Sequence, residues 1–186
     1  APVAAPDTAR TAVDTPVTIL VLANDTDVEG GPLRVASVID APDNGSYSIP
    51  PARDNVTYTP DPGYIGTDWF LYQVCDPGID TIPGNGDDQC DSAWVTVVVN
   101  GPPNGVDNFY SLGEDTTRTV AAPGVLGNDT DPNGDPLTAW LLPGGPAHGT
   151  LLVSGPCPTG LCPDGSFRYR PFANYTGTDS FTYLVC

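Results

Sequence analysis

The chain has 186 residues, of which 23 are acidic and 6 basic, and its formal charge of −17 excludes a protein that binds nucleic acid through the phosphates. With 21 glycines, 22 prolines, no methionine and no lysine, the composition excludes a helical protein and any chemistry that needs a lysine Schiff base. Hydrophobic residues make up 39% of the chain, enough for packed cores, and no apolar run reaches the about 18 residues of a membrane-spanning segment.

Short strands are predicted along the first half of the chain, each a run of β-branched, aromatic or alternating residues between turn signals. Strands of this length and spacing favour an antiparallel β-sandwich, and a small closed barrel is the alternative. The predicted strands cover residues 17–22, 33–39, 45–49, 55–58, 69–75 and 93–99.

The chain contains two copies of one module. The sequence V-L-A-N-D-T-D at residues 21–27 returns as V-L-G-N-D-T-D at 125–131, and residues 64–75 align with 175–186. A segment rich in Gly and Pro separates the copies. We therefore predict a first repeat over 1–100, a linker over 101–105 and a second repeat over 106–186, which lacks the counterpart of the last strand of the first repeat.

The two copies also predict which face of a strand is buried. Alternate residues from Phe70 onward are unchanged in the second copy, whereas the residues between them differ. Because side chains alternate between the two faces of a strand, the unchanged set is predicted to face the core. The unchanged pairs are Phe70 and Phe181, Tyr72 and Tyr183, and Val74 and Val185.

The ordered motifs V-L-x-N-D-T-D, Y-x-P and Y-x-G-T-D-x-F-x-Y-x-V resemble tandem immunoglobulin-like and cadherin-like repeats of very large secreted or cell-surface proteins, such as adhesins and extracellular filaments. The resemblance implies an all-β fold of two tandem immunoglobulin-like antiparallel β-sandwiches, the second lacking its last strand. It also implies a spacer, scaffold or adhesive module, usually associated with calcium, and no enzymatic activity. Cysteine at positions 75 and 186 departs from the family pattern, in which this position is usually polar.

Four of the five cysteines are predicted to form two disulfides, Cys75 with Cys90 and Cys157 with Cys162. Cys186 aligns with Cys75 and is predicted to be unpaired in this chain. Zinc ligation is the alternative, but paired Cys-x-x-Cys spacings are absent and the chain has a single histidine. Disulfides favour an oxidising, extracellular or cell-surface location.

N-glycosylation sequons agree with that location. Five of the ten asparagines lie in Asn-x-Ser/Thr sequences. Together with the disulfides and the proline-rich turns, they favour a eukaryotic extracellular glycoprotein over a bacterial adhesin. The candidate acceptors are Asn24, Asn44, Asn55, Asn128 and Asn174.

The acidic loops that contain the N-D-T-D motif are candidate calcium sites. Calcium takes six to eight hard oxygen ligands at flexible geometry, and these loops cluster carboxylates and amides within one turn. The same residues also cap turns without any metal. Asp7, Asp76 and Asp107 lie near repeat ends and could complete a site between repeats. The candidate ligands in the loops are Asp25, Asp27, Asp129, Asp131, Asn133 and Asp135.

Catalytic residues are not predicted. Asp68 and Asp179 each follow Gly-Thr at the start of a strand, where hydrogen bonding to turn backbone is the expected role. His148, in Pro-Ala-His-Gly, is predicted to be an exposed hairpin residue. No nucleophile with a base, paired catalytic carboxylates in a cleft, or phosphate loop is recognised.

Two functions follow from these features. The first is a structural repeat of a long extracellular fibre or stalk, such as the shaft of an algal ciliary mastigoneme, whose partners are neighbouring repeats or other chains of the fibre. The second is a calcium-dependent adhesin module that binds glycan or protein. Aromatic side chains that could stack on such a ligand are Tyr64, Trp69, Trp140 and Tyr175.

Overall fold

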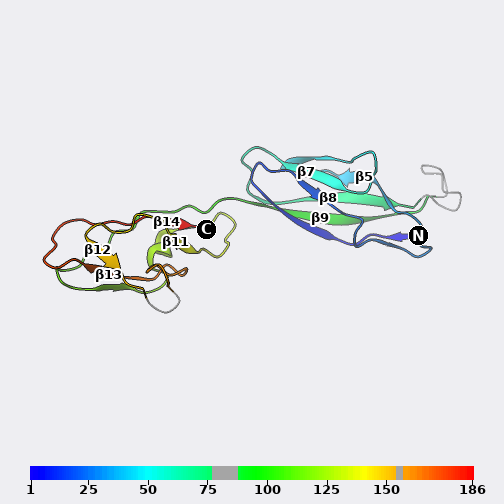
Figure 1. The fold of residues 1–186 in the computed structure, drawn as a ribbon. Coiled ribbons are helices and arrows are strands. Elements are labelled where there is room, and N and C mark those ends of the chain that lie inside the picture. The colour runs from blue at the N-terminus through cyan, green and yellow to red at the C-terminus, as the bar shows by residue number, and fades with distance from the viewer. Residues whose placement is uncertain (77–87, 154–156) are drawn as a thin grey trace. The chain divides into compact units, whose positions relative to one another are not determined.

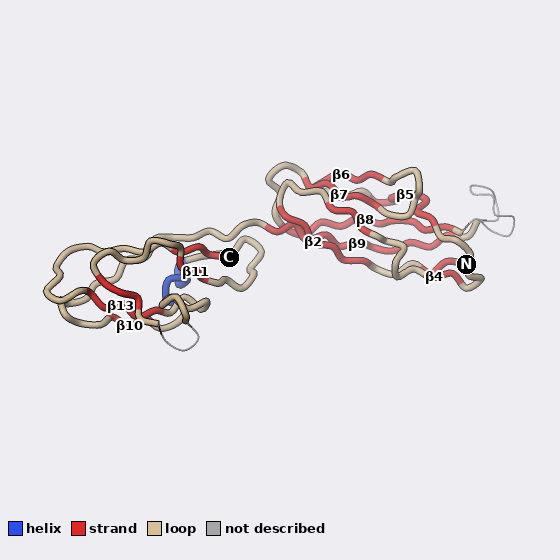
Figure 2. Tube along the Cα trace, in the orientation of Figure 1, coloured by secondary structure: helices blue, strands red, loops and turns tan. Residues whose placement is uncertain are grey.

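The computed structural model describes residues 1–76, 88–153 and 157–186, and it divides into two compact units, Ala1–Gly101 and Pro102–Cys186 (Figure 1). Both units are built from short strands and loops, as the all-β prediction requires (Figure 2). Within the described residues, no helix has the length and hydropathy needed to cross a bilayer.

The first unit is a sandwich of a four-stranded and a three-stranded sheet, with a short two-stranded ladder beside them. The four-stranded sheet has the order β2 (Asp7–Ala12), β9 (Cys90–Asn100), β8 (Gly66–Cys75), β5 (Arg34–Asp40). The three-stranded sheet has the order β3 (Val17–Ile19), β7 (Val56–Pro60), β6 (Gly45–Ser48), and the short ladder joins β1 (Pro2–Val3) to β4 (Thr26–Asp27).

The core of this unit lies between the two sheets because strands from both contribute fully buried side chains. In β8, Phe70, Tyr72 and Val74 are buried, while Trp69, directly before Phe70, is 51% exposed and the residues between the buried ones are half-buried, which confirms the face predicted from the two copies. Valines of β9 alternate in the same way beside them. The core residues are Ile19, Val21, Val35, Val56, Tyr58, Phe70, Tyr72, Val74, Ala93, Val95, Val97 and Val99.

The first unit differs from the sequence prediction in several elements, and its short strands β1 and β4 were not predicted. The strand predicted over 17–22 ends at Ile19, because the Ala23 amide donates to the Leu20 carbonyl and closes a turn. Strand β2 was not predicted, because its sequence D-T-A-R-T-A has no apolar face and its residues are only half-buried or exposed. It pairs in parallel with β9, whereas the other described strand pairs of this unit are antiparallel.

The second unit repeats the arrangement with shorter strands. A three-stranded sheet has the order β10 (Arg118–Val120), β13 (Phe167–Pro171), β12 (Gly149–Leu151), a two-stranded ladder joins β11 (Ala139–Leu141) to β14 (Tyr183–Val185), and a 3-10 helix η1 covers Gly124–Asn128. Phe167 packs at its centre, edge-to-face with Phe181 at 5.2 Å between ring centroids. The core residues are Val125, Leu126, Ala139, Leu151, Leu161 and Phe167.

Strand β14 has one neighbour among the described strands of the second unit. It occupies the place of β8, which in the first unit is flanked by both β5 and β9. The counterpart of β5 is β11, and no described strand of the second unit stands where β9 stands in the first. This agrees with the prediction of a second sandwich without its last strand.

Candidate functional site

The first aspartate of the N-D-T-D motif holds a buried tyrosine. In the first unit, the Tyr72 hydroxyl lies 2.8 Å from Asp25 Oδ1 and 3.1 Å from the Val21 carbonyl oxygen. The backbone amide of Ala5 donates to the same carboxylate over 2.8 Å. Asp25 therefore ties β8 to the N-terminal segment of the chain. Burial, followed by the hydrogen bond to this carboxylate, raises the pKa of Tyr72.

The second unit repeats this contact with the equivalent residues. The Tyr183 hydroxyl lies 2.9 Å from Asp129 Oδ2 and 3.0 Å from the Val125 carbonyl oxygen. The Val106 amide donates to Asp129 Oδ1 over 2.7 Å. Burial and the hydrogen bond to Asp129 raise the pKa of Tyr183 to about 12. This aspartate is therefore used inside the fold in both copies.

The asparagine of the motif also bonds to the fold. Asn24 Nδ2 donates to the Pro6 carbonyl oxygen, and Asn128 Nδ2 donates to the Asp107 carbonyl oxygen, both over 3.1 Å. Both asparagines are exposed, so glycosylation of either one stays a prediction. Of the other candidate acceptors, Asn174 is exposed and has a left-handed φ of 58°, and Asn44 and Asn55 are half-buried.

The second aspartate of the motif closes a turn. Asp27 Oδ1 accepts hydrogen bonds from the Glu29 amide over 2.9 Å and from the Gly31 amide over 3.0 Å. The hydrogen bond from Gly31 outweighs burial and holds the pKa of Asp27 below its usual value. In the second unit, Asp131 Oδ1 accepts in the same way from the amides of Asn133 and Asp135, over 2.8 and 3.1 Å.

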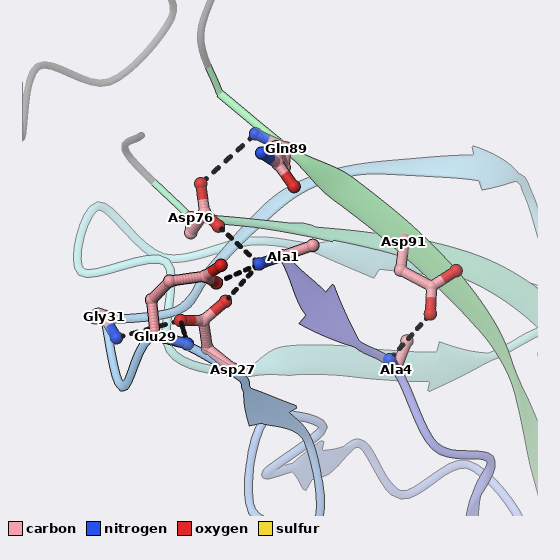
Figure 3. Close-up of polar contacts among 8 residues, drawn as sticks. All are labelled: Ala1, Ala4, Asp27, Glu29, Gly31, Asp76, Gln89 and Asp91. Atoms are coloured by element: carbon pink, nitrogen blue, oxygen red, sulfur yellow. Dashed lines mark hydrogen bonds and ion pairs between the residues drawn. The ribbon is translucent and has the colours of Figure 1, made fainter. Parts of the chain in front are cut away.

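One group of carboxylates in the described part of the chain is compact enough to share a metal ion, and we call it the acidic cluster: Asp27, Glu29 and Asp76. One oxygen from each residue lies within 4.8 Å of the others. Figure 3 shows these three side chains around the amine of Ala1. That amine lies 3.3 Å from Asp27 Oδ2 and 3.8 Å from Asp76 Oδ2, and it forms an ion pair with Glu29 Oε2.

The acidic cluster differs from the ligand set expected from the sequence. Of the calcium ligands predicted in the loops, it contains Asp27, and of the residues predicted at repeat ends it contains Asp76. Glu29 was missed, although it is one of two glutamates in the chain and follows the motif directly. Glu29 joins the acidic cluster because the turn after Asp27 brings its side chain back toward Asp27. The predicted ligands that lie outside the acidic cluster are Asp7, Asp25, Asp107, Asp129, Asp131, Asn133 and Asp135.

Asp7, at the start of β2, has an unusual environment. Its Oδ2 atom is buried and has no hydrogen-bond partner. Burial, followed by repulsion from the nearby carboxylate of Asp25, raises the pKa of Asp7 to about 6. Ionisation of Asp7 is therefore less favourable in the folded protein than in the unfolded chain.

Asp68 and its counterpart Asp179 have the structural role predicted for them. Asp68 is fully buried and accepts hydrogen bonds from the amides of Asp43 and Asn44 over 3.1 and 2.9 Å, and from the Tyr58 hydroxyl over 2.9 Å. Burial, followed by this hydrogen bond, raises the pKa of Tyr58. The carboxylate thus fixes the loop between β5 and β6. Asp179 is bonded likewise to the amides of Ala147 and His148 and to the Tyr169 hydroxyl.

His148 is exposed in the loop before β12, as predicted. Its ring stacks on Tyr175 with 4.4 Å between centroids, and its Nδ1 atom lies 3.9 Å from Asp179 Oδ1. Tyr175 therefore already carries a stacked ring of this chain. Tyr64, another predicted stacking residue, packs against the core of the first unit.

The cysteines form two disulfides, Cys75 with Cys90 and Cys157 with Cys162. The first joins the facing ends of β8 and β9, since Cys75 and Cys90 are directly paired across that ladder. Cys186 is free and exposed.

Two tryptophans form an exposed aromatic surface on the first unit. Trp69 of β8 is 51% exposed and Trp94 of β9 is 47% exposed. Together with Asp40, Ala41 and Asp43 they line an open cavity of about 280 Å³. Trp94 was missed by the sequence analysis, although it alternates with core residues of β9 and therefore had to face outward. Trp140 in the second unit is 58% exposed.

Three solved structures show a weak likeness to this chain. Two endo-fucoidan hydrolases of glycoside hydrolase family 107 match all of this chain at 17% and 19% identity, with TM-scores of 0.38 and 0.33. The extracellular domain of protocadherin GammaB4 matches all of it at 12% identity with a TM-score of 0.37. The chain covers between 26% and 32% of the length of these structures. Likenesses at this level carry no argument about activity.

Comparison with protein families gives a match over both halves of the chain. The model of the bacterial Ig domain matches residues 1–98 and, a second time, residues 100–186. No curated protein matches the chain. The repeated N-D-T-D motif, with its tyrosine and turn contacts, is thus the framework of a domain that occurs twice. The chain belongs to the bacterial Ig domain family, of which it carries two tandem copies.

Proposed function

We propose that this chain is a non-catalytic structural repeat of a long extracellular protein. The observation that carries the proposal is that the polar residues of the N-D-T-D motif form hydrogen bonds within their own unit. In both units the motif aspartates and asparagine bond to tyrosine hydroxyls and backbone groups of their own domain. Residues that make these hydrogen bonds stabilise the domain and do not converge on a substrate.

The family match and the disulfides support the extracellular location in this proposal. Both halves match an Ig-type family, and two disulfides persist best in an oxidising, extracellular environment. In this function the partners are neighbouring repeats or other chains of a fibre or stalk. The narrower setting, a glycosylated shaft such as that of an algal ciliary mastigoneme, rests on the sequence resemblance alone.

The test is the mass per length of the native protein that contains this chain, measured by scanning transmission electron microscopy beside negative-stain images. Tandem domains of about 100 residues predict a thin particle with a regular repeat along its axis. A compact particle without an axial repeat would contradict a fibre or stalk. Removal of sugars before the measurement separates the mass of the chain from that of any glycan.

A second candidate function, an adhesin module for glycan or protein, is favoured by the exposed pair Trp69 and Trp94. Aromatic faces stack on sugar rings and on cationic side chains, and Asp40 and Asp43 add hydrogen-bond acceptors beside them. A glycan array probed with the 186-residue chain, with and without calcium, tests this function. A specific signal that is lost in the double variant Trp69→Ala/Trp94→Ala and kept in Trp140→Ala favours adhesion. If neither the unmodified chain nor the two variants bind any glycan, the result favours the structural repeat.

A further inference from the structure

The outer face of the four-stranded sheet in the first unit carries two exposed indoles close together. Leu71 of β8 lies opposite Trp94 of β9, and Trp69 precedes Leu71 by two positions on the same strand. Opposite residues of a ladder and residues two apart on a strand point to the same face. The two indoles are therefore diagonal neighbours, with Cα atoms about 7–8 Å apart, a separation that two aromatic side chains reach across.

Two carboxylates lie beside the indoles. Asp40 ends β5, the strand next to β8 in Figure 2, and lies opposite Leu71, so its side chain shares the outer face. The amide of Asp43 donates to Oδ1 of the buried Asp68 over 3.1 Å, which fixes the loop that carries the Asp43 carboxylate. We call the lining of this open cavity of about 280 Å³ the aromatic surface: Asp40, Ala41, Asp43, Trp69 and Trp94.

The aromatic surface is acidic. Asp40 and Asp43 are exposed, and in the described part of the chain neither carboxylate has a hydrogen-bond or ion-pair partner. The five residues of the lining include no basic side chain, and the whole chain has a formal charge of −17. A field of this sign attracts and orients cationic ligands and repels anionic ones. Charge complementarity therefore favours a cationic ligand at this surface.

An arginine side chain matches both parts of the aromatic surface. The guanidinium plane stacks on aromatic faces, and the attraction of a cation to a ring is strongest for tryptophan. The N–H groups of the guanidinium form a rigid fork that donates to carboxylate oxygens at the same time. A lysine ammonium is attracted by the same charges but has no plane to stack. Tryptophan and arginine are also enriched among the residues that contribute most to protein interfaces.

We propose that the aromatic surface of the first unit binds an arginine side chain of a partner protein. Trp69 and Trp94 supply the ring faces for the guanidinium, and Asp40 and Asp43 accept its hydrogen bonds. This inference rests on the second candidate function, adhesion, and names the ligand for it. The structural-repeat function is tested by the mass per length and does not depend on this surface.

The first experiment titrates the 186-residue chain carrying Trp140→Phe with a capped peptide of Gly-Arg repeats. The chain has three tryptophans, so the fluorescence of this variant comes from Trp69 and Trp94 alone. Control peptides carry citrulline, a neutral side chain of the same shape, or lysine in place of arginine. At about 0.15 M NaCl the arginine peptide should bind at least about tenfold more tightly than the citrulline peptide and about twofold more tightly than the lysine peptide. Equal affinity for the arginine peptide and either control overturns the inference.

The second experiment removes the rings without any change of charge. In Trp69→Ala/Trp94→Ala, the affinity for the arginine peptide, measured by calorimetry, should fall at least about fivefold, because the cation loses both ring faces. Trp140→Ala makes the same change at an exposed tryptophan of the second unit and should leave the affinity within about twofold. An unchanged affinity in the double variant refutes the inference, because the peptide would then bind through charge alone.

Matched variants of the carboxylates separate this surface from the overall charge of the chain. Asp40→Asn/Asp43→Asn should lower the affinity for the arginine peptide at least about fivefold, because two charged acceptors are lost. Asp54→Asn/Asp61→Asn removes the same charge at two exposed positions of the first unit outside the aromatic surface and should lower it by less than about twofold. Equal losses in the two double variants would show diffuse electrostatic binding and refute the site.

A comparison with glycans separates this inference from adhesion as such. Binding of neutral glycans to the aromatic surface, with no binding of the arginine peptide, refutes the inference and keeps adhesion. Binding of neither ligand refutes the inference and counts against adhesion as well. The inference is supported if the tryptophan and carboxylate variants lose affinity for the arginine peptide and their controls keep it.

Discussion

Tyr72 and Tyr183 each place a hydroxyl against an aspartate carboxylate inside a β-sandwich. Tyr72 is fully buried, and its hydroxyl is shared between Asp25 and the Val21 carbonyl. Removal of the Tyr72 hydroxyl leaves the partly buried Asp25 carboxylate with one hydrogen-bond donor fewer. At the scale of single residues, this contact links the sequence motif to the stability of each unit.

The substitution Tyr72→Phe is expected to destabilise the first unit by about 2 kcal/mol, the value of a hydrogen bond to a charged group. Tyr183→Phe should act similarly on the second unit and leave the first unchanged. Urea unfolding of the whole chain, followed by tryptophan fluorescence, measures both effects. Tyr47→Phe, at a tyrosine that is 40% exposed, is the control and should change stability by less than about 0.5 kcal/mol.

Asp7 predicts a dependence of stability on pH. Its pKa is about 6 in the folded protein, above the ordinary value of 3.8, so the protonated form is favoured by folding. The stabilising contribution of this residue is complete below about pH 4 and is lost as the pH rises through about 6. Asp7→Asn removes this loss and should raise stability above pH 6 by about 1 kcal/mol, a value reduced for partial exposure.

The measurement for Asp7 is urea unfolding of the wild-type chain and Asp7→Asn at pH values from 4 to 8. The difference between the two proteins isolates Asp7 from the other carboxylates, which titrate in both. A difference that stays constant over this range would show that the carboxyl of Asp7 has its ordinary pKa. Asp14→Asn, at another aspartate of the first unit, is the matched control.

The β8–β9 hairpin is the central element of the first unit. Its two strands are paired from Gly66 opposite Val99 to Cys75 opposite Cys90, and the disulfide joins their last pair. The disulfide closes a loop of 15 residues in sequence separation. The bond therefore limits the freedom of the unfolded chain at the end of the longest ladder in this unit.

Replacement of Cys75 and Cys90 together by alanine should lower the free energy of unfolding of the first unit by about 3 kcal/mol, from the entropy of a loop of this length. The shorter loop closed by Cys157 and Cys162 predicts a smaller loss, about 2 kcal/mol, in the second unit. Urea unfolding of the two double variants measures this difference. If either double variant destabilised both units equally, the result would contradict a local role for each disulfide.

Elements with a strong apolar face could be predicted from the sequence, and a strand held mainly by backbone pairing could not. Strand β8 alternates aromatic and outward residues in both copies, so its buried face followed from its pattern. Strand β2 has no such pattern and exists because its backbone pairs with β9. A contact between segments so far apart in the chain leaves no local signal.

At the scale of the whole molecule, the two copies of the domain differ in their strand pairing. In the first unit β8 lies between two strands, whereas β14 in the second pairs with β11 alone among the described strands. The second unit also has shorter strands and a smaller set of buried core residues. These differences predict unequal stability.

We expect the second unit to unfold at a lower temperature than the first, by at least about 5 °C, because less apolar surface is buried around its central strands. Tryptophan fluorescence resolves the two units. A chain with Trp69→Phe and Trp94→Phe reports the second unit through Trp140, and a chain with Trp140→Phe reports the first. Coincident transitions in the two proteins would contradict this prediction.

The sequence by itself determined the fold class, the two copies and the buried face of β8, because these depend on composition, repetition and local periodicity. It also identified the N-D-T-D loops as sites of clustered oxygen atoms. The tertiary structure alone decided what those oxygens bind. Asp25 meets Tyr72, 47 positions away, while Asp27 and Glu29 meet Asp76 after β8. Which carboxylates lie together depends on how distant loops meet in space, and a linear pattern does not contain that distance.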